Sequence, residues 1–343
     1  MKRIHDIFDV MVSVDTLRKA FLILKAKRYK KHKKRIERFE KNLEKNLLKL
    51  HKKLIKGIWK MHKYKYMVRR EHGKLREIWY SSNFGDLVVQ CAIGITLGAL
   101  LNKSLINDTY AGIPGKSIHK NGVRKIFRKI KAFGKKSIYG YKLDIHHFYA
   151  SIDHNELKKA LTHKIKDKCA LALLFNIIDN CPLSVGIPIG NFLSPIFANF
   201  FLNTVDRFIK CFKFSYYRYN DDMLILSSSK DKLHVLRERL HKFVESLKLH
   251  IKKNEQIYPI ERFGFDFIGF VFQRNRVLVR RRIEGHVRYN AFQFHKHPTP
   301  HRARTLNSQW GYFKRVRSGE NFWVKNLGCT IKTFNKMQEA LCS

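Results

Sequence analysis

The sequence predicts a mixed α/β fold of the α+β type, in which helices pack on an antiparallel sheet. The clearest strand signal is a hairpin: apolar runs at residues 216–219 and 223–226 lie on either side of the turn Asn220-Asp221-Asp222. Apolar residues at spacings of three and four predict long helices on both sides of this hairpin. Because no internal repeat or low-complexity linker interrupts the chain, we expect its subdomains to form one continuous architecture.

The chain has enough apolar residues to fold and far more basic than acidic ones. Of its 343 residues, 44% are hydrophobic, which can fill one large core or two moderate ones. The 70 Lys+Arg against 27 Asp+Glu give a net charge of +43, whose self-repulsion lowers stability unless a polyanion neutralises it. Nucleic acid is the polyanion that this composition favours.

A membrane partner is the alternative explanation of the charge, and the sequence disfavours it. A cationic membrane-surface protein would need an amphipathic anchor or a lipidation signal, and the start MKRIHDIFDV contains neither of these nor a signal peptide. The longest apolar stretch, residues 87–101, is too short to span a bilayer and contains Gln90. It therefore predicts a buried helix.

The cysteines indicate a reducing, intracellular compartment. Six of them lie far apart and form no C-x-x-C pair: Cys91, Cys169, Cys181, Cys211, Cys329 and Cys342. This spacing argues against both a zinc site and a disulfide framework. Ordinary small core residues are the simplest interpretation of them.

Basic helical sequence dominates the first part of the chain. Residues 1–70 hold 24 Lys/Arg against 6 Asp/Glu, and six apolar residues recur there at helical spacing: Ile36, Phe39, Leu43, Leu47, Leu50 and Leu54. The pattern predicts an amphipathic helix with a basic outer face. That face is either a solvated helix surface or a surface that follows phosphate groups, and the size of the charge excess favours the second.

Strand and helix patterns then alternate up to residue 144. The segment KLREIWYSS, residues 74–82, alternates apolar and polar residues as a strand does, and residues 87–101 return to helical character. Gly112, Pro114 and Gly115 predict a loop, which a second basic helix follows at residues 122–136. Residues 139–144 predict a strand with Asp144 at its tip.

Helices and short strands complete the chain. Further helices are expected over residues 153–168, with Asp153 or Asn155 as the cap, and over residues 192–208 and 230–249. Two short strands are expected around Gly264 and Gly269. Beyond Arg280 the sequence is basic again and partly helical.

Three carboxylates have the chemistry for divalent cations. Two-metal nucleotidyl transfer uses cations about 3.5 to 4 Å apart, and hard cations of this kind prefer carboxylate oxygens. Asp144 at a strand end, with Asp221 and Asp222 in a hairpin turn, could supply them if the two strands are neighbours in one antiparallel sheet. Taken alone, Asp144 is more often a helix cap and an Asn-Asp-Asp segment is more often an ordinary turn. The combination of the two changes the interpretation.

The order of three segments resembles the reverse transcriptase family. LDIHHFYASIDH precedes GIPIGNFLSPIFANFFLN, which precedes YYRYNDDMLIL, and the resemblance covers about residues 74–272. It implies a right-hand polymerase, with a basic helical N-terminal region at residues 1–73 and fingers and palm on an antiparallel sheet at residues 74–272. A small helical thumb would follow at residues 273–343.

The resemblance implies roles for the residues of the first and third segments. LDIHHFYASID is similar to the first palm motif, in which Asp144 binds both metal ions, the Ile145 carbonyl helps to bind one, and Tyr149 excludes a 2′-hydroxyl. An ordinary core tyrosine is the alternative for Tyr149. YNDD resembles the Y-x-D-D turn, with Asp221 as the second shared ligand. Asp222 would support it, and Tyr219 would lie against the primer.

GIPIGNFLSP resembles the segment that packs under the templating base pair, where Gly190 allows a close backbone approach. Most reverse transcriptases have Gln before this glycine, whereas here Ile189 precedes it. An apolar residue at this position is similar to the error-prone enzymes of diversity-generating retroelements, because a branched side chain cannot hydrogen-bond the nascent pair. Pro195 departs from that group, which has Gln there.

Other matches to the family involve single residues. Lys74 and Arg76 resemble fingers residues that bind the triphosphate, and Lys252 or Lys253 matches a lysine that would protonate the leaving pyrophosphate. Residues 267–270, with Phe267 and Gly269, resemble the primer-grip turn. Trp310 in NSQWGYFKRV, together with residues 321–323, is similar to a thumb whose aromatic and basic residues line a minor groove.

The function that the resemblance implies is RNA-templated synthesis of cDNA from dNTPs, with two Mg²⁺ ions, or Mn²⁺ in their place. A retroelement context adds a structured template RNA, a small basic helical accessory protein and a cytoplasmic location in a bacterial or phage-encoded system. A phage-defence reverse transcriptase is one alternative, and a non-catalytic RNA-binding relative is another. The second would have lost carboxylates, and none is lost here.

Overall fold

The chain divides into two compact units, each assembled from separated segments. The structure, a computed structural model, describes residues 3–342 except 72, 115, 117–121 and 317–318. Unit 1 comprises Met1–Asn107, Ile145–Phe208 and Arg239–Lys252, and unit 2 comprises Asp108–Asp144, Ile209–Glu238 and Lys253–Ser343. The chain therefore passes repeatedly from one unit to the other. The three consecutive ranges expected from the sequence stay a prediction.

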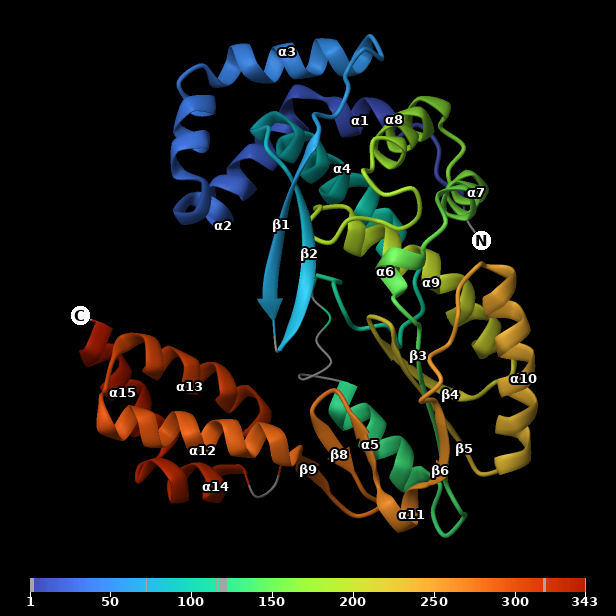
Figure 1. Cartoon of the computed structure of the whole chain (residues 1–343), viewed down its shortest axis with the longest axis vertical. Helices are drawn as coiled ribbons and strands as arrows, with labels where there is room; N and C mark the ends of the chain where they lie inside the picture. The colour runs from blue at the N-terminus through green and yellow to red at the C-terminus, as the bar shows by residue number, and fades with distance from the viewer. Residues whose placement is uncertain (1–2, 72, 115, 117–121, 317–318, 343) are drawn as a thin grey trace. The chain divides into compact units, whose positions relative to one another are not determined.

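Unit 1 begins with helices that enclose an apolar core. These are α1 (Phe8–Val12), α2 (Val14–Glu40) and α3 (Leu43–Ile55), so the expected amphipathic helix of residues 36–54 is divided between α2 and α3 (Figure 1). Phe21 of α2 is buried and its ring lies 5.9 Å from that of Phe39 near the end of the same helix. The two rings also contact Phe84, which begins α4 (Phe84–Lys103).

Helix α4 is a long, apolar helix of unit 1. Its 20 residues give it the length and composition of a membrane span, longer than the stretch of residues 87–101, and 72% of its most apolar window is buried inside the structure. Gly94 and Gly98 face the start of α9 (Ser194–Cys211): an added Cβ at Gly98 would lie 2.8 Å from Cδ1 of Ile196. The expectation of a buried core helix is confirmed.

The sequence indicated only one of the two strands of unit 1. β2 (Lys74–Ser81) pairs with β1 (Tyr64–Glu71) in an antiparallel hairpin, with Tyr64 opposite Ser81 and Arg69 opposite Arg76 (Figure 1). Tyr66, Met67 and Val68 on β1 are about half exposed. With no buried face, β1 has no apolar alternation for sequence analysis to detect.

Three short helices follow the 144–145 connection. They are α6 (Phe148–Ser151), α7 (His154–Lys164) and α8 (Lys168–Asp179). The expected cap is confirmed as Asp153, whose Oδ1 accepts hydrogen bonds from the backbone N–H groups of Asn155 and Glu156 at 2.9 and 3.0 Å. The helix ends at Lys164, earlier than residue 168, and α8 begins with its own cap, Asp167.

Unit 2 contains a four-stranded antiparallel sheet. Its strands are β3 (Tyr139–Asp144), β4 (Ser215–Tyr219), β5 (Asp222–Ser227) and β6 (Gln256–Pro259), in the order β4-β5-β3-β6 (Figure 1). The expected hairpin is therefore β4–β5, and β3 is the neighbour of β5 as the metal hypothesis requires. Two further expected helices are α5 (Val123–Ala132), which belongs to unit 2, and α10 (Lys230–Ser246), whose residues after Glu238 belong to unit 1.

The C-terminal part of unit 2 shares one core with this sheet. After α11 (Ile260–Phe263) come β7 (Phe265–Phe267), β8 (Phe270–Phe272) and β9 (Val277–Val279), then α12 (Arg281–Lys296), α13 (Pro300–Phe313), α14 (Gly319–Leu327) and α15 (Ile331–Cys342). Leu224 of the sheet, Phe267 of β7 and Trp323 of α14 belong to the same buried cluster. The face of the sheet that carries Leu224 is thus fixed to the β7–β8 hairpin by apolar burial, at roughly 25 cal/mol per Å².

Replacing Asp153 tests the cap of α7. Asp153→Ala should lower the free energy of unfolding by about 0.5 to 2 kcal/mol, because two backbone N–H groups lose their acceptor. Asp153→Asn, which keeps a capping oxygen, should retain most of the stability that the cap contributes. Urea denaturation of the two variants and the parent chain measures the difference, and equal losses would contradict the capping role.

The pH dependence of this stabilisation follows from the ion pair with Lys248, whose Nζ lies 2.9 Å from Oδ2 of Asp153. The hydrogen bond from Lys248 is the main reason that the pKa of Asp153 lies below its ordinary value of 3.8. The contribution is therefore complete above the unfolded pKa and is lost as the pH falls through the lower folded value.

Candidate active site

Two of the three motif carboxylates face each other across neighbouring strands. Asp144 is the last residue of β3 and Asp222 the first of β5, and the register pairs them directly. Directly opposite residues of antiparallel strands have Cβ atoms about 4.5 to 5.5 Å apart. Two carboxylates at this separation can share one divalent cation.

The turn before Asp222 is shorter than the sequence suggested. Tyr219 pairs with Asp222, so the loop consists of Asn220 and Asp221 alone, and Asn220 adopts a left-handed φ of +54°. Asp222 is thus a strand residue, and Asp221 is the one carboxylate of the turn itself. The expectation of a three-residue turn that includes Asp222 is wrong, because Asp222 is already paired with Tyr219 as part of β5.

Buried side chains hold this end of the sheet in place. Leu143 and Met223, the residues next to the two carboxylates, are 1% and 0% exposed. Arg218 of β4 is also completely buried, and its Nη1 donates a hydrogen bond of 2.8 Å to the carbonyl of Asn220 in the turn. Sequence analysis missed Arg218. Its one signal was a charged residue inside an apolar strand, and such a residue needs a buried partner.

The electrostatics of the pair favour a bound cation. Burial is the main reason that the pKa of Asp222 rises from 3.8 to about 6, and Lys142, whose Nζ lies 3.9 Å from Oδ1 of Asp222, opposes this shift. The carboxylates of Asp144 and Asp266 raise the pKa and Arg280 lowers it. A divalent cation would relieve the repulsion between Asp144 and Asp222.

The donor set suits Mg²⁺ or Mn²⁺ in its chemistry, because it consists of carboxylate oxygens. Among the residues that the structure describes, no three or more His, Cys, Asp or Glu side chains form a ready metal cluster. The register places Asp144 opposite Asp222, so these two could hold a cation together, and the role of Asp221 as the second shared ligand stays a prediction. Ile145, which begins the next segment of unit 1, is buried and forms an isolated bridge with Ile251. Its ligand role stays a prediction.

In unit 1, the structure brings Tyr149 and the 186–190 segment together. The N–H of Ile187 donates to the carbonyl of Tyr149 at 2.8 Å, and the N–H of Gly186 to that of Ile152 at 2.9 Å. Gly186 has a φ of +97°, and a Cβ there would lie 2.7 Å from the backbone of Ala150. Only glycine fits between these segments without strain.

The same segment is fixed to β2 on its other side. The N–H of Trp79 donates to the carbonyl of Ile189 at 2.9 Å. Gly190 has a φ of +106°, and a Cβ there would lie 2.7 Å from Cγ2 of Ile78 and 2.9 Å from the carbonyl oxygen of Trp79. Gly190 therefore packs closely against β2, and its expected approach to a templating base pair stays a prediction. Ile189 itself keeps 36% of its surface exposed.

The remaining nucleotide-binding candidates lie on exposed segments. Arg76 is exposed on β2, opposite Arg69, and Lys74 begins that strand, although its side chain lies outside the described part of the chain. Lys253 is exposed in a turn just before β6, and Lys252, the alternative candidate, is half-buried. Their roles in binding triphosphate or pyrophosphate stay predictions.

The primer and template candidates belong to the apolar cluster of unit 2. Phe267 is buried, and Tyr219 and Trp310 pack against the cluster, with the Trp310 ring 5.1 Å from that of Trp323. Gly269 lies in the two-residue turn between β7 and β8, where a Cβ would come within 2.8 Å of Ile283 and of Tyr312. Their contacts with nucleic acid stay predictions, whereas their packing inside the unit is clear.

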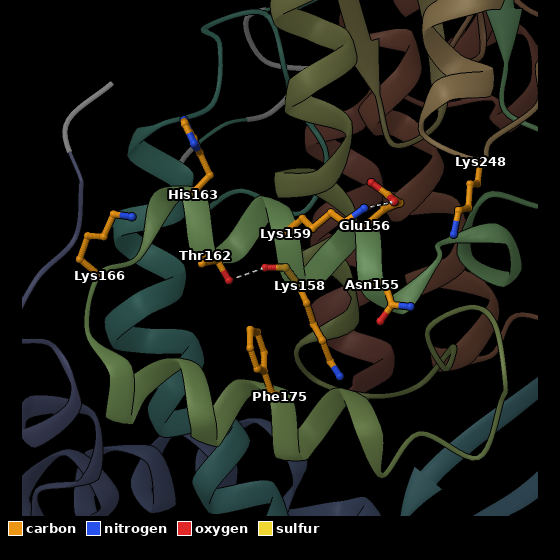
Figure 2. Close-up of a pocket in the computed structure, with 9 residues that line it drawn as sticks. All are labelled: Asn155, Glu156, Lys158, Lys159, Thr162, His163, Lys166, Phe175 and Lys248. Carbon is orange, nitrogen blue, oxygen red and sulfur yellow. Dashed lines mark hydrogen bonds and ion pairs between the residues drawn. The ribbon is translucent and has the colours of Figure 1, made fainter.

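A basic groove of about 700 Å³ lies on α7 and α8 of unit 1 and contains none of the motif residues. Four lysines line it, namely Lys158, Lys159, Lys166 and Lys248, and Figure 2 shows Lys158 beside the ring of Phe175. Three of them have carboxylate partners: Lys158 with Asp179, Lys159 with Glu156, and Lys248 with Asp153. These pairs cancel much of the positive charge, so we assign the groove no ligand.

Comparison with known proteins was made by sequence and by structure. The sequence profile of one family, described as reverse transcriptase (RNA-dependent DNA polymerase), matches residues 91–271, more than half of the chain. Protein YkfC of Escherichia coli K12 is 23% identical over 253 residues, which cover 61% of this chain and 66% of YkfC. An uncharacterised 91 kDa protein in the cob intron of Schizosaccharomyces pombe is 30% identical over 136 residues, covering 37% of this chain and 16% of that protein.

Solved structures with a similar fold include telomerases. Apo telomerase from Candida tropicalis has a TM-score of 0.53 at 11% identity, covering 82% of this chain and 58% of the telomerase. Telomerase from Candida albicans, solved with a fragment of telomeric RNA, has a TM-score of 0.51 at 10% identity, covering 84% and 65%. At these identities the likeness concerns the fold, which is that of the right-hand polymerases.

Replacing Gly190 tests its close approach to β2. Gly190→Ala should lower the free energy of unfolding by about 1 to 3 kcal/mol, because it combines a left-handed φ with a clash against the Trp79 carbonyl. Gly285→Ala is the matched control, since nothing lies within 4 Å of its added Cβ. Chemical denaturation of both variants measures the difference, and equal stabilities would contradict the close packing.

Proposed function

Because this chain belongs to the reverse transcriptase (RNA-dependent DNA polymerase) family, we propose that it copies an RNA template into cDNA by two-metal nucleotidyl transfer. The chain spans 66% of the length of YkfC and 58% of that of the Candida tropicalis telomerase. Because the match to these proteins is partial, we base the proposed activity on the residues of this chain. The observation that carries the proposal is the pairing of Asp144 with Asp222 at the end of the central strands.

The proposed chemistry assigns a task to each part of the site. Bound Mg²⁺ would activate the primer 3′-hydroxyl and stabilise the charge on the triphosphate. Asp144 and Asp222, with Asp221 beside them, would hold the ions. Tyr149, next to the 186–190 segment, would exclude a ribose 2′-hydroxyl by its bulk. The net charge of +43 would supply the attraction to the RNA and cDNA backbones.

Removing one carboxylate tests the catalytic proposal. Asp222→Asn should lower primer extension on an RNA template with dNTPs and Mg²⁺ by at least about a hundredfold, because an amide neither neutralises the cations nor binds them as strongly. Asp144→Asn and Asp221→Asn should also impair extension. Asp179→Asn removes a surface carboxylate of α8 and should leave extension unchanged. Extension by Asp222→Asn at the parent rate would overturn the proposal.

The subclass that we propose is the error-prone enzyme of a diversity-generating retroelement. Its support is Ile189: this half-exposed branched side chain precedes Gly190, where most members of the family have Gln. Without a hydrogen-bonding group at this place, a misfit at the nascent pair would be penalised less. The partners would be a structured template RNA and a small basic helical accessory protein in the same cytoplasm. A near-repeat pair of DNA segments beside the gene would support this subclass.

A phage-defence reverse transcriptase is the second candidate, and Pro195 favours it. Diversity-generating enzymes have Gln at this position, whereas here Pro195 is the second residue of α9, in a first turn that tolerates proline. A non-catalytic RNA-binding relative is disfavoured, because the three motif carboxylates are all present. Faithful copying by the purified protein would favour the defence candidate.

Changing Ile189 tests the error-prone proposal. Ile189→Gln should lower misincorporation opposite template adenine several-fold, because the amide can hydrogen-bond the nascent pair, with each such bond contributing about 1 kcal/mol. Sequencing of extension products measures the error rate. Val185→Gln is the control, since Val185 is an exposed aliphatic residue of the same segment, 48% exposed. An unchanged error spectrum in Ile189→Gln would contradict the role of Ile189.

A further inference from the structure

Lys142 lies between the catalytic carboxylates and the β7–β8 hairpin. It is on β3, two residues before Asp144, so the two side chains project from the same face of the strand. Its Nζ lies 3.9 Å from Oδ1 of Asp222 and donates a hydrogen bond of 3.0 Å to the backbone carbonyl of Asp266. One ammonium group therefore contacts both Asp222 of the acid pair and the backbone of β7.

Arg280 also fixes the β7–β8 hairpin, through two contacts. The guanidinium of Arg280 forms an ion pair with Asp266, and its backbone N–H donates to the carbonyl of Gly269 at 2.9 Å. Asp266 immediately precedes Phe267, which is buried in the cluster of unit 2. Lys142 and Arg280 thus hold Asp266 by its carbonyl and its carboxylate respectively.

The positive charge of Lys142 affects metal binding, because it lies close to Asp222. Lys142 and Asp222 keep 33% and 31% of their side-chain surfaces exposed, so their attraction is weakened by water but not abolished. Without a divalent cation, this ammonium forms an ion pair with Asp222. With one, it would be a like charge close to the ion, and it would weaken metal binding.

We propose that Lys142 is a positioning residue, which fixes the β7–β8 hairpin at a set distance from Asp144 and Asp222. Its positive charge at the same time weakens metal binding by these carboxylates. The inference rests on the proposed polymerase function, in which residues 267–270 of this hairpin support the primer end. Lys142→Met removes the charge and the hydrogen bond and keeps an apolar stem of similar length. Lys142→Arg keeps the charge and the ability to donate.

The first test measures metal binding without turnover. Titration of the free full-length protein with Mn²⁺, followed by electron paramagnetic resonance, should show binding about three- to tenfold tighter in Lys142→Met, because a nearby positive charge is removed. Lys142→Arg should bind as the parent does. Lys232→Met, the same charge change on an exposed position of α10, is the matched control and should also leave binding unchanged.

The second test measures single-nucleotide addition at saturating Mg²⁺. Lys142→Met should lower the maximal rate about tenfold with little change in the KM for dNTP, because a primer end displaced by a fraction of an ångström reacts more slowly. Lys142→Arg should recover most of the rate. Partial unfolding does not produce tighter metal binding together with slower nucleotide addition, because it lowers both the metal affinity and the rate.

The outcomes separate the two proposals. Parent-like rate in Lys142→Met, or Mn²⁺ binding that is unchanged or weaker, overturns the role of Lys142 and leaves the polymerase proposal standing. A parent chain that extends no primer overturns the proposed function and the positioning role with it. Slower addition with tighter Mn²⁺ binding, restored by Lys142→Arg and absent in Lys232→Met, supports the inference.

Discussion

The antiparallel register between β3 and β5 is the constraint on which the rest of the site depends. Successive side chains of a strand point to opposite faces, so a slip of one residue would separate Asp222 from Asp144 and would also turn the buried Met223 to the other face. The burial of Leu143 and Met223 therefore fixes the alignment of the carboxylates. Core packing that stabilises the sheet also sets the distance between two like charges at its end, where the sheet leaves the core.

Placing two carboxylates opposite each other is unfavourable, and the surrounding residues offset part of that cost. The raised pKa of Asp222 has burial as its main cause, and Lys142 and Arg280 act against it. The buried Arg218 donates a hydrogen bond to the carbonyl of Asn220, so it helps to fix the geometry of the turn that precedes Asp222. Lys142 and Arg280 therefore compensate only part of the unfavourable electrostatics of the carboxylate pair, and a bound divalent cation would compensate more of it.

The sequence predicted those features that leave a local pattern. The β4–β5 hairpin, the cap at Asp153 and the buried helix α4 all follow from alternation, capping chemistry or apolar runs. β1 could not be predicted, because its consecutive residues Tyr66, Met67 and Val68 are all about half exposed and leave no alternation of buried and exposed positions. The position of Asp222 within β5 and the burial of Arg218 depend on pairing with distant segments, as does the assembly of each unit from three separate stretches. None of these leaves a signal in nearby residues.

The two units hold different parts of the motif set. In unit 1, the 186–190 segment is fixed between the Tyr149 carbonyl and the Trp79 N–H, with glycines where both backbones approach closely. In unit 2, strand register fixes Asp144 and Asp222. The peptide bond between Asp144 and Ile145 joins these two arrangements, because it is also the point where the chain passes from one unit to the other. The residues proposed to select the nucleotide therefore lie in unit 1, and Asp144 and Asp222 lie in unit 2, where strand register and not the 186–190 segment aligns them.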